Sequence, residues 1–460
     1  MNAILFGTSS AIALAALASA AIDLAPAASA WAGRIGIGRF PDEAAWREAA
    51  AERAVKWLIR TPTVRVTDQT RLLWLDMLRG EYRRAAIQHW QEAALVLGLT
   101  ELAGMGADEE PAATGSAAAR FGPAGAAPPE TAAAARTANL RTAEAFAARL
   151  RPRLRAALGR FLDRKFGEDG AWRVKPGQVD AAMLAFAVMR CGMEPERYRR
   201  AYDETAELVL RHVGDDGLVR YRQGAVGGYR YVDTIGLVCP FLTAYGLAYG
   251  REDCVDLAIR QIEAYERRGL HPEIGLPYHA YAACDGRPLG LCGWGRGLAW
   301  YAIGLAEVWR LLPASERRKA EMEARVAKLA RAAARFQQAD GSWRWTVTRP
   351  ETRADSSATA ALAWFLLRSA AASGAPDDAR ERALRALTYL RGVTRRGGAV
   401  DFAQGDTRDI GVYAQRFDVL PFAQGFALRA AAAAEQVEAA ERADPAPAEP
   451  MPAEPAGRRA

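Results

Sequence analysis

The chain has 460 residues, half of them apolar, and its 61 basic and 54 acidic residues give a formal net charge of +7. This composition can bury a large core, and the excess of alanine favours closely packed helices. No run of five or six like charges occurs, so the arginines are interpreted as solvated outer faces of helices. A nucleic-acid partner is therefore not expected, and the charge supports only a mild preference for anionic ligands.

The first 40 residues are predicted to be an apolar N-terminal segment. Residues 3–22 are long enough to span a bilayer or to form the apolar part of a signal peptide, and Ala28-Ser29-Ala30 resembles a cleavage site. Basic residues follow this stretch, from Arg34 onward, and none precedes it. The positive-inside rule then favours a cytoplasmic body behind a membrane anchor. Membrane association through residues 3–22, export by a signal peptide and a packed N-terminal helix all stay open.

A single helical domain is predicted over residues 41–440. A flexible insertion at about 105–136 and a disordered tail at 441–460 lack the large apolar side chains that would offset their ordering entropy. Elsewhere apolar residues recur with a period near 3.6 between glycine and proline breaks, which predicts twelve helices. They lie near residues 43–60, 86–103, 137–165, 178–192, 196–213, 233–249, 253–268, 294–312, 316–337, 354–372, 378–391 and 421–438.

Glycine turns that carry aromatic or charged residues recur between these helices. They begin near residues 169, 216, 274, 340 and 397, roughly 45 to 65 residues apart, which is close to the period of a helical-pair repeat. Units of this size cannot bury their own apolar face and must stack on one another. Six such hairpins predict an all-α (α/α)6 barrel with the aromatic turns at one mouth. An open superhelical solenoid is the structural alternative.

The cysteines and histidines form no metal-binding pattern. Five scattered cysteines include no CxxC pair, and four histidines include no HExxH motif. The thiols are interpreted as buried and reduced. We expect no structural metal and no cofactor.

Four ordered sequence blocks resemble the unsaturated glucuronyl and unsaturated rhamnogalacturonyl hydrolases, a family of glycoside hydrolases. They are Tyr-Val-Asp-Thr at 231–234 with Cys-Pro-Phe-Leu at 239–242, Tyr-His at 278–279, the tryptophan-flanked glycine string 294–300 and Asp-Ser-Ser-Ala-Thr-Ala at 355–360. The resemblance spans roughly residues 170–435, and more weakly 89–91. It implies an (α/α)6 barrel that removes a 4,5-unsaturated uronic acid from the non-reducing end of lyase-generated oligosaccharides. A carboxylic acid would protonate C4 of the vinyl ether, and water would add at C5.

The same resemblance assigns the general acid and base to Asp233. To donate a proton near neutral pH, this carboxyl needs a pKa well above the ordinary value of about 3.9, through burial or a nearby carboxylate. Asp180, at the start of the preceding inner helix, is the candidate for that second carboxylate. For both aspartates, capping of their own helix is the structural alternative. His279 follows a glycine turn and is predicted to contact the substrate or the attacking water.

Arg296 lies between two glycines and is the candidate for binding the uronate carboxylate through its guanidinium fork, with an ion pair to an aspartate as the alternative. Trp90, Trp294 and Trp300 are candidates for stacking on sugar rings, although Trp300 already lies inside the helical pattern. The hydroxyls of Ser356 and Ser357 are predicted either to bind the carboxylate or to cap the helix that follows. The sequence departs from the family at 298–299, where Leu-Ala replaces the usual Asn-Gly.

Three other functions stay open. A polysaccharide lyase or a sugar epimerase would use the same barrel, and a lyase would need a Tyr or His base with an Arg, which His279, Tyr281 and Arg296 supply. A noncatalytic helical-repeat binding protein would need neither carboxylates at helix starts nor aromatics in the same turns.

Overall fold

The computed structural model describes residues 2–62, 64–83, 88–105, 130–222 and 228–443. Over this part of the chain, six helices form an inner ring in which each contacts the next and the last contacts the first. They are α4 (His89–Leu102), α6 (Ala181–Met189), α8 (Asp233–Tyr249), α10 (Gly295–Leu311), α12 (Ser356–Ser369) and α14 (Pro421–Ala443). The sequence of contacts closes the ring and rules out an open solenoid.

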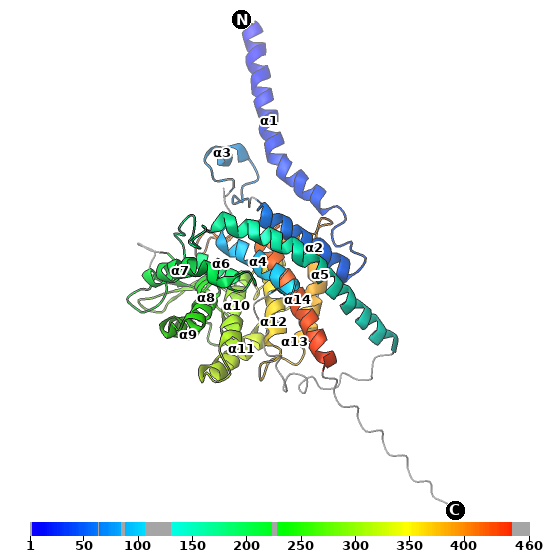
Figure 1. Ribbon diagram of the computed structural model, residues 1–460. Coiled ribbons are helices and arrows are strands. Elements are labelled where there is room, and N and C mark those ends of the chain that lie inside the picture. Colours follow the sequence, from blue (N-terminus) through cyan, green and yellow to red (C-terminus); the bar gives the residue numbers. More distant parts are fainter. Residues whose placement is uncertain (1, 63, 84–87, 106–129, 223–227, 444–460) are drawn as a thin grey trace, which may run out of the picture.

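Six outer helices alternate with the inner ones and pack around them (Figure 1). They are α2 (Glu43–Ile59), α5 (Glu130–Lys165), α7 (Arg199–Arg211), α9 (Glu252–Gly269), α11 (Arg318–Ala334) and α13 (Ala379–Gly392). All twelve predicted helices are present in the described residues, and the (α/α)6 barrel is confirmed.

The division into inner and outer helices follows from their sequences. Inner helices such as α6 and α10 are buried on almost every side, α10 from Gly295 to Trp309, because each packs on two neighbours and an outer helix. The outer helices α7 and α9 instead keep a charged face in solvent.

The ring closes between α4 and α14, and glycine lets these two helices approach closely. A Cβ on Gly98 would lie 2.2 Å from the carbonyl oxygen of Gly425. Any larger residue there would force the two helices apart.

The five predicted glycine turns connect five of the outer helices, all but α2, to the next inner helix. Gly170 and Gly341 have φ values of +73° and +85°, a conformation that favours glycine. Short antiparallel bridges, such as that between Phe166 and Trp172, close these turns. The turn repeat is therefore a real structural repeat that returns the chain to the same end of the barrel.

In the described part of the chain, five short strands that the periodicity did not predict lie at that end. β1 (Tyr229–Tyr231), β2 (Tyr278–Ala282) and β3 (Pro288–Cys292) form an antiparallel sheet, and β4 (Ala403–Gln404) pairs with β5 (Phe417–Asp418). Strands this short leave too few alternating residues for a sequence pattern to reveal them.

The remaining described elements are α1 (Asn2–Arg34), α3 (Leu73–Leu78) and the 3-10 turn Pro195–Tyr198. α1 projects away from the barrel (Figure 1), and its 24-residue part Ala11–Arg34 is unburied and apolar enough to cross a membrane by length and composition.

The flexible insertion predicted at 105–136 lies mostly outside the described residues, but α5 already begins at Glu130 within it. Of the predicted tail, residues 444–460 lie outside the described part. All five cysteines are free, and the thiol of Cys284 is exposed rather than buried.

A buried ion-pair network joins the inner helices. Arg429 of α14 donates to Glu101 of α4, with Nε 2.9 Å from Oε1, and also to Glu307 of α10. Burial alone would raise the pKa of Glu101, but the charges of Arg429 and Arg368 lower it to about 2. These charges are therefore paired across three helices of the ring.

Candidate active site

A cavity of about 430 Å³ opens where α4, α8 and α10 begin. Six of the predicted site residues line it: Trp90, Asp233, His279, Trp294, Arg296 and Trp300. Asp180, Ser356 and Ser357 are not part of its wall. The turn repeat explains this gathering, because it returns each inner helix start to one end of the barrel.

Asp233 is the first residue of α8 and does not cap it: the N-cap position belongs to Val232. The three-stranded sheet places His279 beside this carboxylate, because Tyr231 of β1 pairs with Ala280 of β2 and the Val232 amide donates to the His279 carbonyl at 2.9 Å. His279 Nε2 consequently lies 3.5 Å from Asp233 Oδ2. That oxygen is buried and accepts no hydrogen bond from the described residues, so it is available to a proton or a ligand.

The opposite side of the His279 ring contacts Tyr413. The Tyr413 hydroxyl accepts a hydrogen bond from the Leu291 amide at 2.8 Å and lies 3.1 Å from His279 Nδ1. Since its oxygen already accepts a hydrogen bond from the Leu291 amide, the hydroxyl proton is free to form a hydrogen bond to Nδ1. This arrangement favours the tautomer that carries the proton on Nε2, which points toward Asp233.

Asp180 is buried and caps a neighbouring helix rather than its own. Its Oδ2 accepts from the His89 amide at the start of α4, at 3.1 Å. Burial raises the pKa of the Asp180 carboxyl, against the opposing effects of His89 and of the backbone amides of His89 and Trp90. Burial also raises the pKa of Tyr221 far above its ordinary value, and the charges of Asp233 and Asp180 add to this. Both carboxylates therefore act on one cavity-lining hydroxyl.

Arg296 is almost fully buried and hydrogen-bonds the backbone of the segment 404–407. Nη1 donates to the Gln404 carbonyl at 2.8 Å, and Nη2 donates to the Gly405 carbonyl at 2.7 Å. Longer contacts reach Thr407 Oγ1 at 3.3 Å and Ser357 Oγ at 3.4 Å. The expected alternative, an ion pair with a site aspartate, is not found in the described part of the chain. The guanidinium instead fixes one wall of the cavity.

The three tryptophans present little surface to the cavity. Trp294 donates from Nε1 to Gln404 Oε1 at 2.9 Å, and its ring packs 4.5 Å from that of His279. Trp90 and Trp300 meet edge to face, with ring centres 5.5 Å apart. All three are at most 4% exposed. They line the cavity but leave little ring surface open for a sugar to stack on.

Ser356 and Ser357 are completely buried and do not line the cavity, and among the described residues their hydroxyls do not cap α12 either, because Asp355 does. Asp355 caps α12 by accepting from the Ser357 amide at 2.9 Å, and the Ser357 hydroxyl donates to the same carboxylate at 2.7 Å. The Ser357 hydroxyl lies 3.4 Å from Arg296 Nη1, on the side of the guanidinium away from the cavity lining.

Sequence reasoning missed one wall of the cavity, formed by Tyr221, Arg222, Tyr231 and the segment 406–409. The Tyr231 hydroxyl donates to Asp409 Oδ1 at 3.0 Å, and Arg222 Nη1 lies 3.2 Å from Asp409 Oδ2. Burial would raise the pKa of Asp409, but the Ile410 amide, Tyr231 and Arg222 hold it below its ordinary value. Only the polar composition of 404–409 hinted at this role. Among the described residues, no group of three or more His, Cys, Asp or Glu side chains is arranged to hold a metal.

The family model described as Glycosyl Hydrolase Family 88 matches residues 142–434. No curated protein matches the sequence.

Several solved structures resemble this fold. A possible member of family GH105 from Klebsiella pneumoniae superposes with a TM-score of 0.62 at 14% identity, covering 87% of this chain and 95% of that one. An unsaturated glucuronyl hydrolase specific for heparin gives 0.56 at 14% identity, covering 86% and 98%. The unsaturated glucuronyl hydrolase from Bacillus sp. GL1, responsible for degradation of glycosaminoglycan, gives 0.52 at 18% identity, covering 84% and 93%. At such identities these likenesses establish the fold.

Proposed function

The chain belongs to glycosyl hydrolase family 88 and is a glycoside hydrolase, and from this premise we propose that it removes a 4,5-unsaturated uronic acid from lyase-generated oligosaccharides. The observation that carries the proposal is the Asp233 carboxylate on the cavity wall, 3.5 Å from His279, with a buried oxygen that has no hydrogen-bond donor among the described residues. The cavity volume of about 430 Å³ lies within the range of small-ligand sites.

In the proposed reaction, protonated Asp233 donates its proton to C4 of the vinyl ether, and positive charge develops at C5. Water adds its oxygen to C5 and returns a proton to the Asp233 carboxylate, so the acid is regenerated. The hemiketal opens to a ketone, and the hemiacetal left at C1 expels the remaining sugar. The usual separation rule for two glycosidase carboxylates does not apply, because the glycosidic oxygen is not the group first protonated.

His279 is proposed to position the water or the Asp233 carboxylate. The Tyr413 hydroxyl supports the tautomer with the proton on Nε2. The Nε2 edge of the His279 ring therefore carries one hydrogen-bond donor, which is directed at the reacting centre. The Asp180 carboxyl is buried at the start of α4 and does not line the cavity. We propose that its charge acts on the cavity-lining groups, such as the Tyr221 hydroxyl, without contact with the substrate.

The uronate carboxylate requires a cation on the wall. Arg296 supplies charge, but its two terminal nitrogens already donate to the Gln404 and Gly405 carbonyls. The terminal nitrogens of Arg222 also have partners, Asp409 and the Arg408 carbonyl, but unlike Arg296 this side chain keeps 40% of its surface exposed and lines the cavity, so it can also reach a ligand. We therefore assign the direct carboxylate contact to Arg222 and the positioning of the 404–407 wall to Arg296. Trp90, Trp294 and Trp300 would shape the space for the sugar ring.

The test is incubation of the full chain with a panel of lyase-digested polysaccharides, followed by mass spectrometry. The proposal predicts fragments whose summed mass exceeds that of the substrate by one water, and the panel member that reacts identifies the substrate. New unsaturated fragments from intact polyuronides would instead identify a polysaccharide lyase. Binding of oligosaccharides without any product would identify a binding protein.

A further inference from the structure

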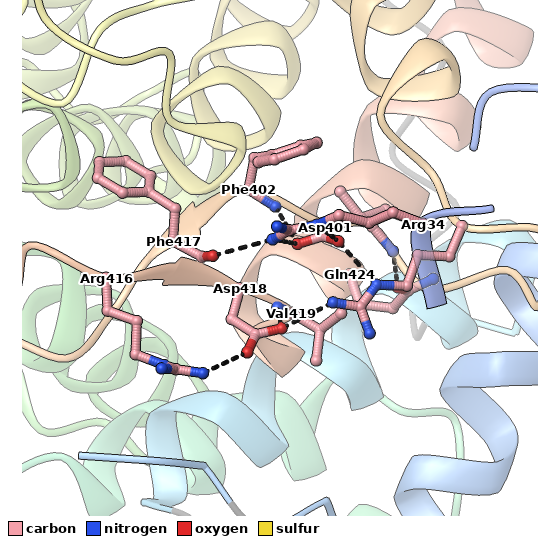
Figure 2. Close-up of polar contacts among 10 residues, drawn as sticks. Arg34, Asp401, Phe402, Arg416, Phe417, Asp418, Val419 and Gln424 are labelled. Atoms are coloured by element: carbon pink, nitrogen blue, oxygen red, sulfur yellow. Dashed lines mark hydrogen bonds and ion pairs between the residues drawn. The ribbon is translucent and has the colours of Figure 1, made fainter. Parts of the chain in front are cut away.

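α1 is fixed to the barrel at its C-terminal end. Arg34 donates to both carboxylate oxygens of Asp401, at 2.9 and 3.1 Å, and to the Phe417 carbonyl at 3.2 Å (Figure 2). Its guanidinium also lies 4.4 Å from the centre of the Phe402 ring. Burial would raise the pKa of Asp401, but Arg34 and Arg395 lower it, so the pair stays charged at neutral pH. The end of α1 is thus held by a partly buried, bidentate ion pair.

A second contact fixes α1 where its apolar sequence is interrupted by Asp23. This carboxylate accepts hydrogen bonds from the amides of Leu72 and Leu73, both at 2.8 Å, where α3 begins. α3 therefore lies against α1 (Figure 1). The charge of Asp23 is satisfied at this level of the helix, and the sequence before it, residues 3–22, contains no charged residue.

α3 presents an apolar patch to solvent. The side chains of this patch are Leu72, Trp74, Met77 and Leu78, with exposures of 52%, 37%, 43% and 78%. The exposed residues Arg71 and Arg79 bracket the patch. A tryptophan and leucines flanked by arginines are typical of segments that lie at a membrane interface with anionic lipids.

We propose that the part of α1 before Asp23 spans a lipid bilayer and that α3 lies in the interface of that bilayer, beside the barrel. Residues 3–22 would extend about 30 Å as a helix, which equals the hydrocarbon thickness of a typical bilayer. Asp23 then lies at the boundary, where its partners are the amides of α3. Cleavage near Ala28-Ser29-Ala30 would separate Asp23 from the barrel and break this contact.

This placement sets the active-site end of the barrel beside the membrane. α3 contributes Asp76 to a second cavity, which shares Asp406 and Arg408 with the active-site cavity. Arg408 Nη2 also donates to the Val66 carbonyl in the segment that leads to α3, at 3.2 Å. The enzyme would therefore take up oligosaccharides close to the lipid surface.

The first test is flotation of the full chain, synthesised in the presence of phosphatidylcholine and phosphatidylglycerol vesicles. The intact chain should float with the vesicles and resist alkaline extraction. Leu17→Arg, in the proposed spanning part, should reduce flotation at least tenfold, whereas Val174→Arg, on an exposed barrel position, should leave it unchanged. A chain that stays in solution, or one shortened by cleavage after Ala30, would overturn the anchor.

The second test locates α3. In a Cys284→Ser background, Leu78→Cys and Leu247→Cys are each labelled with an environment-sensitive fluorophore; Leu247 is exposed near the far end of α8. Addition of vesicles should shift the emission of the Leu78→Cys label to shorter wavelength and leave the Leu247→Cys label unchanged. An unshifted label at 78 on a floating protein would overturn the interfacial position of α3, and so would equal shifts at both positions.

Discussion

Replacement of Arg296 by lysine separates wall positioning from substrate binding. The guanidinium donates to two buried carbonyls, at 2.8 and 2.7 Å from Gln404 and Gly405. A lysine ammonium on a shorter side chain can reach only one of them at this geometry. Loss of one charge-assisted hydrogen bond costs about 2 kcal/mol, and the abandoned carbonyl stays buried. For about 400 folded residues this corresponds to a fall in Tm of about 2 °C.

The assay combines thermal unfolding with steady-state kinetics on a lyase-derived oligosaccharide. Arg296→Lys should lower Tm and also raise KM, because the 404–407 wall shifts. Arg222→Lys is the matched control: this side chain is 40% exposed, so KM should rise about tenfold with Tm unchanged, as expected for a lost carboxylate contact. If Arg296→Lys raises KM at an unchanged Tm while Arg222→Lys behaves as wild type, the two roles are the reverse of those assigned here.

Three further predictions concern groups around the site and the ring. Asp180→Asn should lower kcat/KM at least tenfold at an unchanged Tm, because asparagine still accepts from the His89 amide but carries no charge; full activity in this variant would remove Asp180 from the mechanism. Tyr413→Phe should reduce kcat about tenfold, since the hydroxyl that supports the Nε2 tautomer of His279 is lost, and an unaltered kcat would contradict that role. The free energy of unfolding should fall as pH drops from about 4.5 to about 2, because the depressed pKa of Glu101 stabilises the fold above this window; Glu101→Gln should flatten that dependence, and an equal slope in both proteins would refute it.

The sequence was sufficient for the helices of the barrel and favoured its closed form, with an open solenoid as the alternative. The period of 3.6 residues and the glycine turns depend on local chemistry, so the helices and their alternation could be predicted before any contact was known. The position of Asp233 at the start of α8 also followed from the family resemblance and the helical pattern. Closure of the ring by Gly98 and Gly425 was not visible, because the two residues are far apart in the chain.

The walls of the cavity were harder to predict for the same reason. Arg296 contacts a segment more than a hundred residues away, with 108 positions separating it from Gln404, so its choice between substrate, aspartate and backbone depended on tertiary structure. His279 reaches Asp233 through a strand of only five residues. Asp355 caps α12 and holds Ser357 behind Arg296. The motif alone left open whether its side chains cap the helix or bind the substrate carboxylate.

The most direct test of the proposed function follows the ultraviolet absorbance of the conjugated uronide double bond after addition of wild-type protein or Asp233→Asn. Addition of water to the vinyl ether removes this absorbance, so the wild-type protein should make it fall steadily. Asp233→Asn keeps the shape of the side chain but cannot supply the proton, so its rate should drop by a factor of about 10³ or more while Tm and oligosaccharide binding stay unchanged. Near wild-type loss of absorbance in Asp233→Asn, or a rise in absorbance with the wild-type protein, would contradict the assignment.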